Sequence, residues 1–360
     1  MPARVTLARM SLFGRRKHQA LGIDIGSAGV KVLEMSAVRG GYRADRCAFE
    51  PLPRYAVVEH GISDLEATSE AVRRAVSYSR SARRNAVVAV SQTHAVSRTI
   101  SLPAGLSDRE MEEQVMIEAA QQIPHPLDEV NLDYRVTGGA RAGSDDEVMI
   151  TACRKEIVED YTAVMELAGL RAVIVDVGLF AMERGYKFVA ATLGESLEGR
   201  AIALMDFGDV STRLDLFVDG AVIYGRDQNF GGRILTENIR SRYGIDYREA
   251  EALKRTGDLP QNYEADLLAP FREAMAREAA RGMEFCLSAR HGVEHVDALL
   301  ICGGCAQIPD MAPLIESHVG VPTLIADPFA PGSGIRASKL VARYAPLMIK
   351  AAGLAVRGAT

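Results

Sequence analysis

The sequence has 360 residues, of which 48% are hydrophobic and 25% charged, which is the balance of a globular protein with room for two domains. A formal net charge of -5, 6% aromatic residues and no tryptophan argue against nucleic acid as a partner, whether held by charge or by base stacking. No apolar run approaches the roughly 18 residues that a membrane span needs, so we expect a cytoplasmic protein without a transmembrane segment.

The chain is expected to begin with a disordered leader at residues 1–19, in which Met10 is an alternative start to Met1. After this leader the pattern of apolar residues and glycines changes to that of a folded domain. It predicts, in order, a strand at 21–25, a glycine-containing turn at 26–29, a strand at 30–35, a helix over 65–80 and a strand at 86–90.

The chain changes character between residues 95 and 172. The pattern there predicts a strand at 96–100, a helix over 108–122, strands at 129–136 and 147–152, and a helix over 155–168. Ser107 is placed to cap the first of these helices, and Pro124 lies just beyond its end. This β-α-β-β-α set predicts a small subdomain inserted into a larger fold.

The main pattern resumes after this segment. It predicts a strand at 171–175, a helix over 177–192, strands at 201–207, 214–218 and 221–224, helices over 231–289, a strand at 298–301 and a C-terminal helix over 337–354. Asp219-Gly220 between two apolar runs is a strong hairpin signal.

Two short motifs in distant parts of the chain share one pattern. Residues 24–31 (DIGSAGVK) and 206–213 (DFGDVSTR) each have an acid near the end of an apolar strand, a glycine two positions later and a base seven positions after the acid. Each is predicted to form a tight hairpin whose turn aims backbone N–H groups at an anion. One such motif is a common strand-to-turn signal, but the pair favours a shared phosphate site.

The residue types in these motifs suit a triphosphate with Mg²⁺. Asp24 and Asp206 are expected to face each other across a cleft and to hold Mg²⁺ through water, since Mg²⁺ keeps much of its hydration shell. Lys31 is expected either to reach a phosphate or to lie exposed on its strand. The turns supply glycines that permit close approach and hydroxyl donors: Gly26, Gly29, Ser27, Ser211 and Thr212.

A third motif is expected to bind a nucleoside. Gly303 and Gly304 follow an apolar strand and leave room for an adenosine against the backbone. Upstream, Glu251 and Lys254 lie three residues apart on one face of a predicted helix. They are expected to contact the ribose hydroxyls and the adenine edge, or alternatively to form an exposed ion pair.

The cysteines are expected to be packing residues. There are five, an odd number that does not suit a disulfide framework. Cys302 and Cys305, with His291 and His295 just upstream, imitate a zinc site. A predicted strand occupies most of the short interval between His295 and Cys302, which makes zinc and redox chemistry the minor alternatives.

The three motifs in this order resemble the phosphate and adenosine motifs of the actin, Hsp70 and sugar-kinase superfamily. A more specific resemblance is to the PilM family, the actin-like cytoplasmic component of the type IV pilus inner-membrane assembly complex. It covers nearly the whole chain and is carried by residues 21–27 (LGIDIGS), 122–134 (QIPHPLDEVNLDY), 168–170 (AGL) and the stretch 344–355.

The resemblance implies an α/β fold of the actin-like (ribonuclease H-like) type with two lobes and an inserted subdomain as in FtsA and PilM. Residues 20–94, 173–199 and a C-terminal helix at 337–357 would form the first lobe, 95–172 the insertion and 200–336 the second lobe. The cofactors implied are ATP and Mg²⁺, with Asp24 and Asp206 as metal ligands. The expected nucleotide contacts are Gly26, Ser27, Ala28, Gly29, Lys31, Gly208, Asp209, Ser211, Thr212, Gly232, Glu251, Lys254, Gly303, Gly304 and Cys305.

The resemblance also implies a partner. In this family a groove between the first lobe and the insertion receives the N-terminal cytoplasmic peptide of the membrane protein PilN, which would recruit the chain to the inner membrane. The pilus motor and other platform proteins are further expected partners.

The sequence departs from the family at one position. Members usually carry a glutamate shortly after the "VDV" that begins the connecting helix, whereas Gly178 follows Asp176-Val177 here and Glu183 lies a turn or more further on. A general base must reach the attacking water, so we expect ATP binding with slow hydrolysis or none. A small-molecule kinase of the same superfamily and an FtsA-like membrane-tethered filament protein stay as alternatives.

Overall fold

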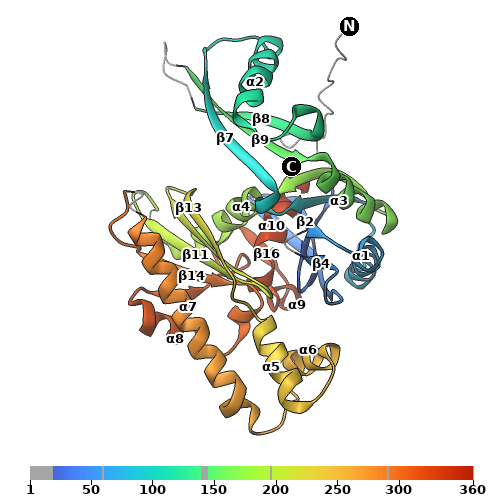
Figure 1. The fold of residues 1–360 in the computed structure, drawn as a ribbon, viewed down its shortest axis with the longest axis vertical. Helices are drawn as coiled ribbons and strands as arrows, with labels where there is room; N and C mark the ends of the chain where they lie inside the picture. Colours follow the sequence, from blue (N-terminus) through green and yellow to red (C-terminus); the bar gives the residue numbers. More distant parts are fainter. Residues whose placement is uncertain (1–18, 59–60, 139–144, 195–196, 290–291, 360) are drawn as a thin grey trace.

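The structure, a computed structural model, is built on two large sheets with the same plan (Figure 1). It describes residues 19–58, 61–138, 145–194, 197–289 and 292–359. The first sheet has the spatial order β10 (Arg171–Val177), β6 (Asn85–Val90), β1 (Leu21–Gly26), β2 (Gly29–Val38), β3 (Gly41–Pro51) and β16 (Ile335–Ala337). The strands β1, β2 and β3 form an antiparallel meander, and β6 and β10 extend the sheet in parallel from β1.

The second sheet repeats this plan. Its order is β13 (Ala221–Gln228), β12 (Thr212–Val218), β11 (Ala201–Phe207), β14 (Ala298–Cys302) and β15 (Thr323–Ile325). Again the first three strands in the chain form an antiparallel meander and the last two add in parallel. The register is also shared, because Asp24 lies opposite Lys31 in one hairpin and Asp206 opposite Arg213 in the other. The two predicted hairpins are thus confirmed as equivalent parts of two related sheets.

Helices cover the outer faces of both sheets. The first sheet is packed by α1 (Leu65–Ser79) and α3 (Lys155–Leu167), and the second by α7 (Ala269–Ser288) and α8 (Met311–Val319). The helices α5 (Arg233–Tyr243) and α6 (Tyr247–Thr256) pack on each other and form the far end of the second lobe (Figure 1). Alternate side chains of β11 face opposite ways, so that Met205 packs toward α7 and Leu204 toward the centre of the molecule. Both faces of this strand are therefore buried.

Two helices lie between the sheets. They are α4 (Gly178–Ala190) and α10 (Ile349–Ala359), which contact each other extensively. Their backbones come into contact because Gly353 and Gly185 have no side chain. A Cβ on Gly353 would lie 1.8 Å from the carbonyl oxygen of Ala181, and a Cβ on Gly185 would lie 2.1 Å from the carbonyl oxygen of Ile349. This close crossing fixes the N-terminal end of α10 at the opening between the two sheets.

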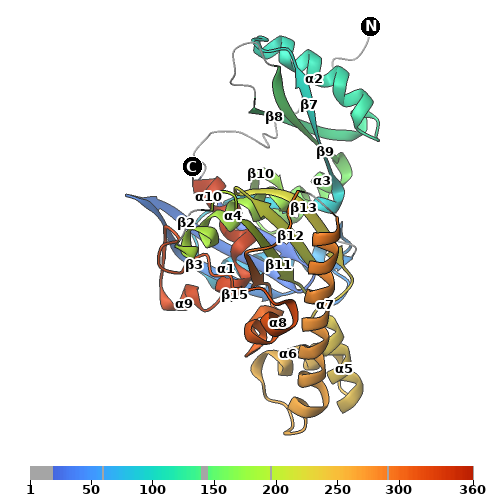
Figure 2. The ribbon, with the colours of Figure 1, turned by 90° about the vertical axis from the view of Figure 1, so that its left-hand side faces the viewer.

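A third sheet projects from the first lobe, at the opposite end of the molecule from α5 and α6 (Figure 2). It consists of β7 (Ala95–Leu102), β9 (Asp146–Arg154) and β8 (Val130–Gly138), and α2 (Asp108–Gln122) packs on it through residues such as Val115. The helix has the predicted bounds. Its capping box explains its start, since the Ser107 hydroxyl accepts from the Glu110 N–H and the Glu110 carboxylate accepts from the Ser107 N–H.

The helix α3, which the prediction places in the insertion of residues 95–172, contacts β8 and β9 but packs mainly on the first lobe. Its side chains Tyr161, Val164 and Met165 lie in the hydrophobic core of the first lobe, together with residues of α1 and β6. We therefore propose that the insertion runs from β7 to β9 and ends near residue 154.

The predicted C-terminal helix over 337–354 is wrong. The chain there forms β16, then α9 (Lys339–Ala342), a turn of 3₁₀ helix at Ala345–Leu347, and only then α10. Pro346 has no N–H for helical hydrogen bonding and conflicts with the preceding turn. The pattern also missed β3, β15, α8, and the small pair β4 (Val57–Val58) and β5 (Gly61–Ile62).

The chain shows no membrane-spanning element in its described ranges, where every helix is too short or too polar to cross a bilayer. The leader predicted at residues 1–19 lies outside the described residues except for Gln19.

Candidate nucleotide-binding site

A cleft of about 860 Å³ lies between the two sheets and receives the turns of both hairpins. Its volume is within the range of small-molecule sites. All but two of the predicted site residues line it: Asp24, Gly26, Ser27, Ala28, Lys31, Asp206, Gly208, Asp209, Ser211, Gly232, Glu251, Lys254, Gly303, Gly304 and Cys305. Residues from β1, β11, α6 and the β14 turn are thus brought together from distant parts of the chain.

The structure does not bring Gly29 and Thr212 to this cleft. A Cβ on Gly29 would lie 2.4 Å from the carbonyl oxygen of Glu50, so this glycine is needed for the close approach of β3. The Thr212 hydroxyl is buried and donates to the carbonyl oxygen of Phe230 at 2.7 Å. Both residues therefore support the hairpins from behind instead of facing a ligand.

The first hairpin places an acid and a base side by side. Lys31 Nζ donates to Asp24 Oδ2 at 2.8 Å, and the two side chains are 14% and 9% exposed. Burial alone would raise the pKa of Asp24, but the neighbouring Lys31 and Lys350 outweigh it and hold the pKa below its ordinary value. The Asp24 carboxylate is therefore charged at neutral pH.

The second hairpin uses its base differently. Arg213 lies opposite Asp206 in the register, but its guanidinium pairs with Asp215 at 2.8 Å and with Asp227 at 2.7 Å. In the turn, the Gly208 N–H donates to the carbonyl oxygen of Ser211 at 3.0 Å. Asp206 is consequently left without the cross-strand partner that Asp24 has.

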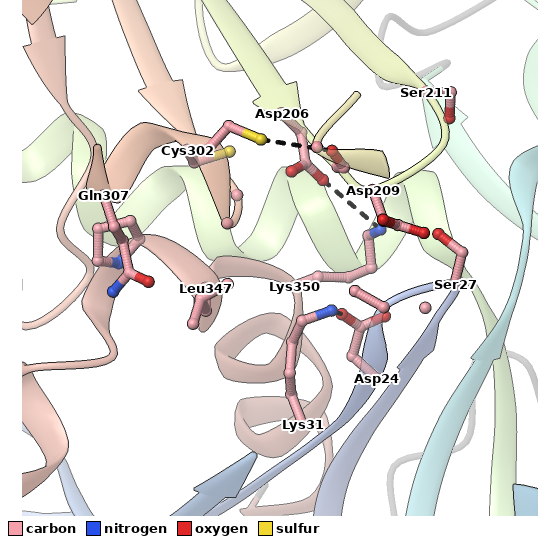
Figure 3. A pocket seen from close by; sticks show the side chains of 18 of the residues that line it. Asp24, Ser27, Lys31, Asp206, Asp209, Ser211, Cys302, Gln307, Leu347 and Lys350 are labelled. Atoms are coloured by element: carbon pink, nitrogen blue, oxygen red, sulfur yellow. Dashed lines mark hydrogen bonds and ion pairs between the residues drawn. The ribbon is translucent and has the colours of Figure 1, made fainter. Parts of the chain in front are cut away.

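A lysine from another element takes that place. Lys350, at the start of α10, extends into the cleft between Asp24 and Asp206 (Figure 3). Its Nζ lies 3.9 Å from Asp206 Oδ2. Burial would lower the pKa of Lys350, but Asp24 and Asp206 outweigh that effect and raise it. Lys350 is not among the predicted site residues, because nothing in the pattern of the C-terminal segment links it to the two hairpins.

Asp209, in the turn of the second hairpin, is held by a salt bridge. Arg233, from the start of α5, donates to its carboxylate at 2.6 Å. The Gly232 N–H also donates to the carbonyl oxygen of Gly208 at 3.0 Å, which joins the start of α5 to the second hairpin. These contacts fix the turn that faces the cleft.

The predicted nucleoside end is formed by α6 and the turn after β14. Glu251 binds Lys254 at 2.6 Å and the Thr236 hydroxyl at 2.7 Å, so the two predicted contact residues pair with each other while lining the cleft. Burial would raise the pKa of Glu251, but Lys254 and the other donors outweigh it and lower the pKa. The two residues thus form the ion pair of the alternative prediction, but it is mostly buried and lines the cavity.

The turn after β14 shows why glycines occur there. Gly303 has φ +86°, and a Cβ on it would lie 2.4 Å from the carbonyl oxygen of Phe207. Gly304 is different, because a Cβ there would meet only Leu347, at 3.9 Å. Gly304 therefore faces open space in the cleft, where a flat ring can lie against the backbone.

The cysteines in this turn behave as packing residues. Cys302 and Cys305 are 1% and 8% exposed, and burial raises the pKa of Cys305 to about 12. Its Sγ contacts the carbonyl oxygen of Gly208 at 3.7 Å. No group of three or more His, Cys, Asp or Glu in the described chain is arranged to hold a metal ion. His291, part of the zinc alternative, lies outside the described residues.

The start of α4 brings no carboxylate to the described lining of the cleft. Gly178 lines it beside Gln92, whose Oε1 would lie 3.0 Å from a Cβ on residue 178. Asp176 is fully buried and pairs with Arg184 and Arg357. Glu183 is not among the lining residues, and burial raises its pKa.

The donor set fits Mg²⁺ only together with a phosphate ligand. Figure 3 shows the carboxylates of Asp24, Asp206 and Asp209 where the hairpins meet, and Asp24 and Asp206 have lysines as neighbours. Mg²⁺ is usually bound through one or two carboxylates, substrate phosphates and several waters. The small residues of the turns leave space for such an ion and its phosphates.

Two sheets of one topology, each with an acid-bearing hairpin at a shared cleft and with a helix pair between them, define an actin-like fold. In agreement, the structure resembles the ethanolamine utilization protein EutJ from Carboxydothermus hydrogenoformans with a TM-score of 0.54 and 14% identity, covering 94% of this chain and 89% of that chain. The model of the family described as type IV pilus assembly protein PilM matches residues 22–359. The chain therefore belongs to the PilM family.

A solved structure described as a PilM–PilN type IV pilus biogenesis complex is a nearer likeness. It matches with a TM-score of 0.75 and 26% identity, over 96% of this chain and 100% of that chain. Since the likeness extends over nearly the whole chain, it includes the projecting sheet as well as the two lobes.

Proposed function

We propose that this protein is a cytoplasmic actin-like adaptor of the type IV pilus assembly complex. It binds ATP and Mg²⁺ in the cleft and the N-terminal cytoplasmic peptide of the inner-membrane protein PilN, which recruits it to the membrane. The observation that carries this proposal is the convergence of two equivalent acid-bearing hairpins on one cleft, in a chain similar throughout to a PilM–PilN complex.

The nucleotide is proposed to lie with its phosphates between the two hairpins. The turn residues Ser27 and Ser211 supply hydroxyls for the phosphate oxygens, and Gly208 leaves space for them. The adenosine lies against the Gly303–Gly304 turn, with Glu251 and Lys254 beside it. Mg²⁺, held by water at Asp24 and Asp206, would neutralise charge on the phosphates.

Hydrolysis is proposed to be slow or absent. A general base has to lie within hydrogen-bond reach of the attacking water, directly or through one water. Where α4 opens onto the cleft, the side chain present is the amide of Gln92 beside Gly178, and an amide can orient water but cannot take a proton at neutral pH. We expect a phosphate-release rate below about one per minute, a slow turnover by enzyme standards.

The peptide is proposed to bind between the first lobe and the projecting sheet. That sheet has its own small core. The chain passes from the first lobe into the sheet at the start of β7 and returns to the first lobe at the end of β9, directly before α3. The nucleotide cleft lies next to the same junction, because Tyr161 of α3 lines it. Nucleotide binding and peptide binding are therefore expected to affect each other.

The test is a titration of a PilN N-terminal peptide against the wild type and Asp24→Ala, with and without MgATP. Glu284→Ala, an exposed acid on α7, is the matched control. We expect the wild type and the control to bind peptide, and Asp24→Ala to lose the effect of MgATP on that binding. If the wild type bound neither the peptide nor the nucleotide, the proposal would be wrong.

A further inference from the structure

The two hairpins are related by topology and register but not by how their acids are paired. In the first, the base seven residues after the acid forms a 2.8 Å hydrogen bond with it, between Lys31 and Asp24. In the second, the equivalent Arg213 is held by Asp215 and Asp227 and turns away from Asp206. The positive charge next to Asp206 comes instead from Lys350, a residue of α10.

Lys350 is available for a ligand in a way that Lys31 is not. Its side chain is 26% exposed, and its 3.9 Å contact with Asp206 is longer than a hydrogen bond. Within the described ranges its ammonium donates to no acceptor at hydrogen-bond distance. Three N–H donors are thus directed into a cleft that contains Ser27 and Asp209 in the same region (Figure 3).

The position of Lys350 on its helix points to the same conclusion. It is the second residue of α10, whose first N–H groups have no acceptor within the helix. A helix N-terminus carries partial positive charge, so it disfavours a lysine and favours an anion. Helix stability therefore does not explain a lysine here. Asp206 supplies one counter-charge, and the helix N-terminus adds to the attraction for an anionic ligand.

The lysine is also held firmly in place. Ile349, beside it, packs in the core between α4 and the second sheet, and the carbonyl oxygen of Ile349 touches the backbone of Gly185. The rest of α10 packs on β1 and β2 of the first sheet, while Asp206 belongs to the second sheet. The Lys350 ammonium is consequently placed at the joint between the two lobes.

We propose that Lys350 is the phosphate-binding cation of the second hairpin and makes nucleotide binding only weakly dependent on Mg²⁺. This inference rests on the proposed nucleotide site. Without a cation, Asp24 and Asp206 would repel the phosphates of ATP. The Lys350 ammonium lies between those carboxylates and the phosphates and hydrogen-bonds the phosphate oxygens, so it performs part of the neutralisation that Mg²⁺ performs.

The experiment is a calorimetric titration of ATP into the full-length protein, once with excess Mg²⁺ and once with EDTA. Lys350→Met keeps the length of the side chain and removes its charge. Lys339→Met, an exposed lysine on α9, is the matched control. Lys350→Met combined with Asp206→Asn tests whether the lysine only compensates a buried carboxylate, since that variant removes both charges of the pair.

We expect the wild type and Lys339→Met to bind ATP in EDTA within about tenfold of their affinity in Mg²⁺. Lys350→Met should lose more than about tenfold in EDTA and clearly less in Mg²⁺. The double variant should unfold at the wild-type temperature without regaining affinity in EDTA.

Equal losses in the two conditions, no loss in either, or recovery of affinity in the double variant would overturn the role of Lys350. Absence of ATP binding by the wild type in both conditions would overturn the nucleotide site itself, and this inference with it. The two failures are therefore distinguishable.

Discussion

The crossing of α4 and α10 offers a sharp test of how the cleft is held together. Substituting Gly353→Ala adds a Cβ that lies 1.8 Å from the carbonyl oxygen of Ala181 and 3.0 Å from the N of Gly185. Both neighbours are backbone atoms, so no side-chain rotation relieves the contact and the helices have to separate. Overpacking of this kind costs about 1–3 kcal/mol, and a rigid backbone contact belongs at the upper end.

Part of this cost is offset by helix propensity. Alanine is favoured over glycine by about 1 kcal/mol in a helix interior. We therefore expect Gly353→Ala to lower the free energy of unfolding by about 2 kcal/mol, the difference of these two contributions. The midpoint of thermal unfolding should fall by about 3 °C, and ATP affinity should fall with it because Lys350 moves with α10.

The matched control is Gly282→Ala on α7. There the added Cβ meets the side-chain ends Nε2 of Gln228 at 2.4 Å and Cε of Met205 at 3.1 Å. Within the described chain the Gln228 amide has no hydrogen-bond partner to lose, so it is free to turn aside. Differential scanning fluorimetry should find this variant within about 1 kcal/mol of the wild type. Equal midpoints for the two variants would refute the proposed backbone contact.

Three further predictions concern the cleft, the insertion and the cysteines. Arg54 connects the two lobes, because it forms a 2.6 Å ion pair with Glu237 and lies over the ring of Tyr247. Arg54→Ala should therefore accelerate nucleotide dissociation several-fold in stopped-flow measurements, and an unchanged rate would contradict this. Ser107→Ala removes the cap of α2, so the free energy of opening measured by amide hydrogen exchange should fall by about 1 kcal/mol in α2 and stay the same in α7. Unchanged exchange in α2 would contradict this. The pKa of Cys305 is raised to about 12, so its neutral thiol should resist iodoacetamide up to pH 9, and rapid alkylation at that pH would show the site to be open.

The two acid-bearing hairpins were predictable because their signals are local. An acid at the end of an apolar strand, a glycine turn and a returning strand lie within eight residues of each other, as in 24–31 and 206–213. The bounds of α2 follow equally from Ser107 and the residues next to it. In these cases the residues that specify the structure are also neighbours in the chain.

The remaining features depend on contacts between distant segments. The direction of Arg213 is set by Asp227, fourteen positions away on another strand, and Lys350 reaches Asp206 only because α10 packs between the sheets. The helical pattern of α3 suits the projecting sheet and the first lobe equally, and only the packing of residues such as Tyr161 decides. Pro346 is a local signal against a single C-terminal helix, because proline lacks the N–H that a helix interior needs.

The most direct test is whether the cleft takes up a nucleotide at the glycine turn after β14. Residue 304 has ordinary backbone angles, φ −62° and ψ −40°, and a Cβ there points into open space, so Gly304→Val should fold normally while filling the proposed adenosine position. Calorimetry with MgATP should find one site in the wild type and an affinity at least about tenfold weaker in Gly304→Val, at an unchanged unfolding temperature. Equal affinity in the two proteins, or no binding by the wild type, would contradict the account.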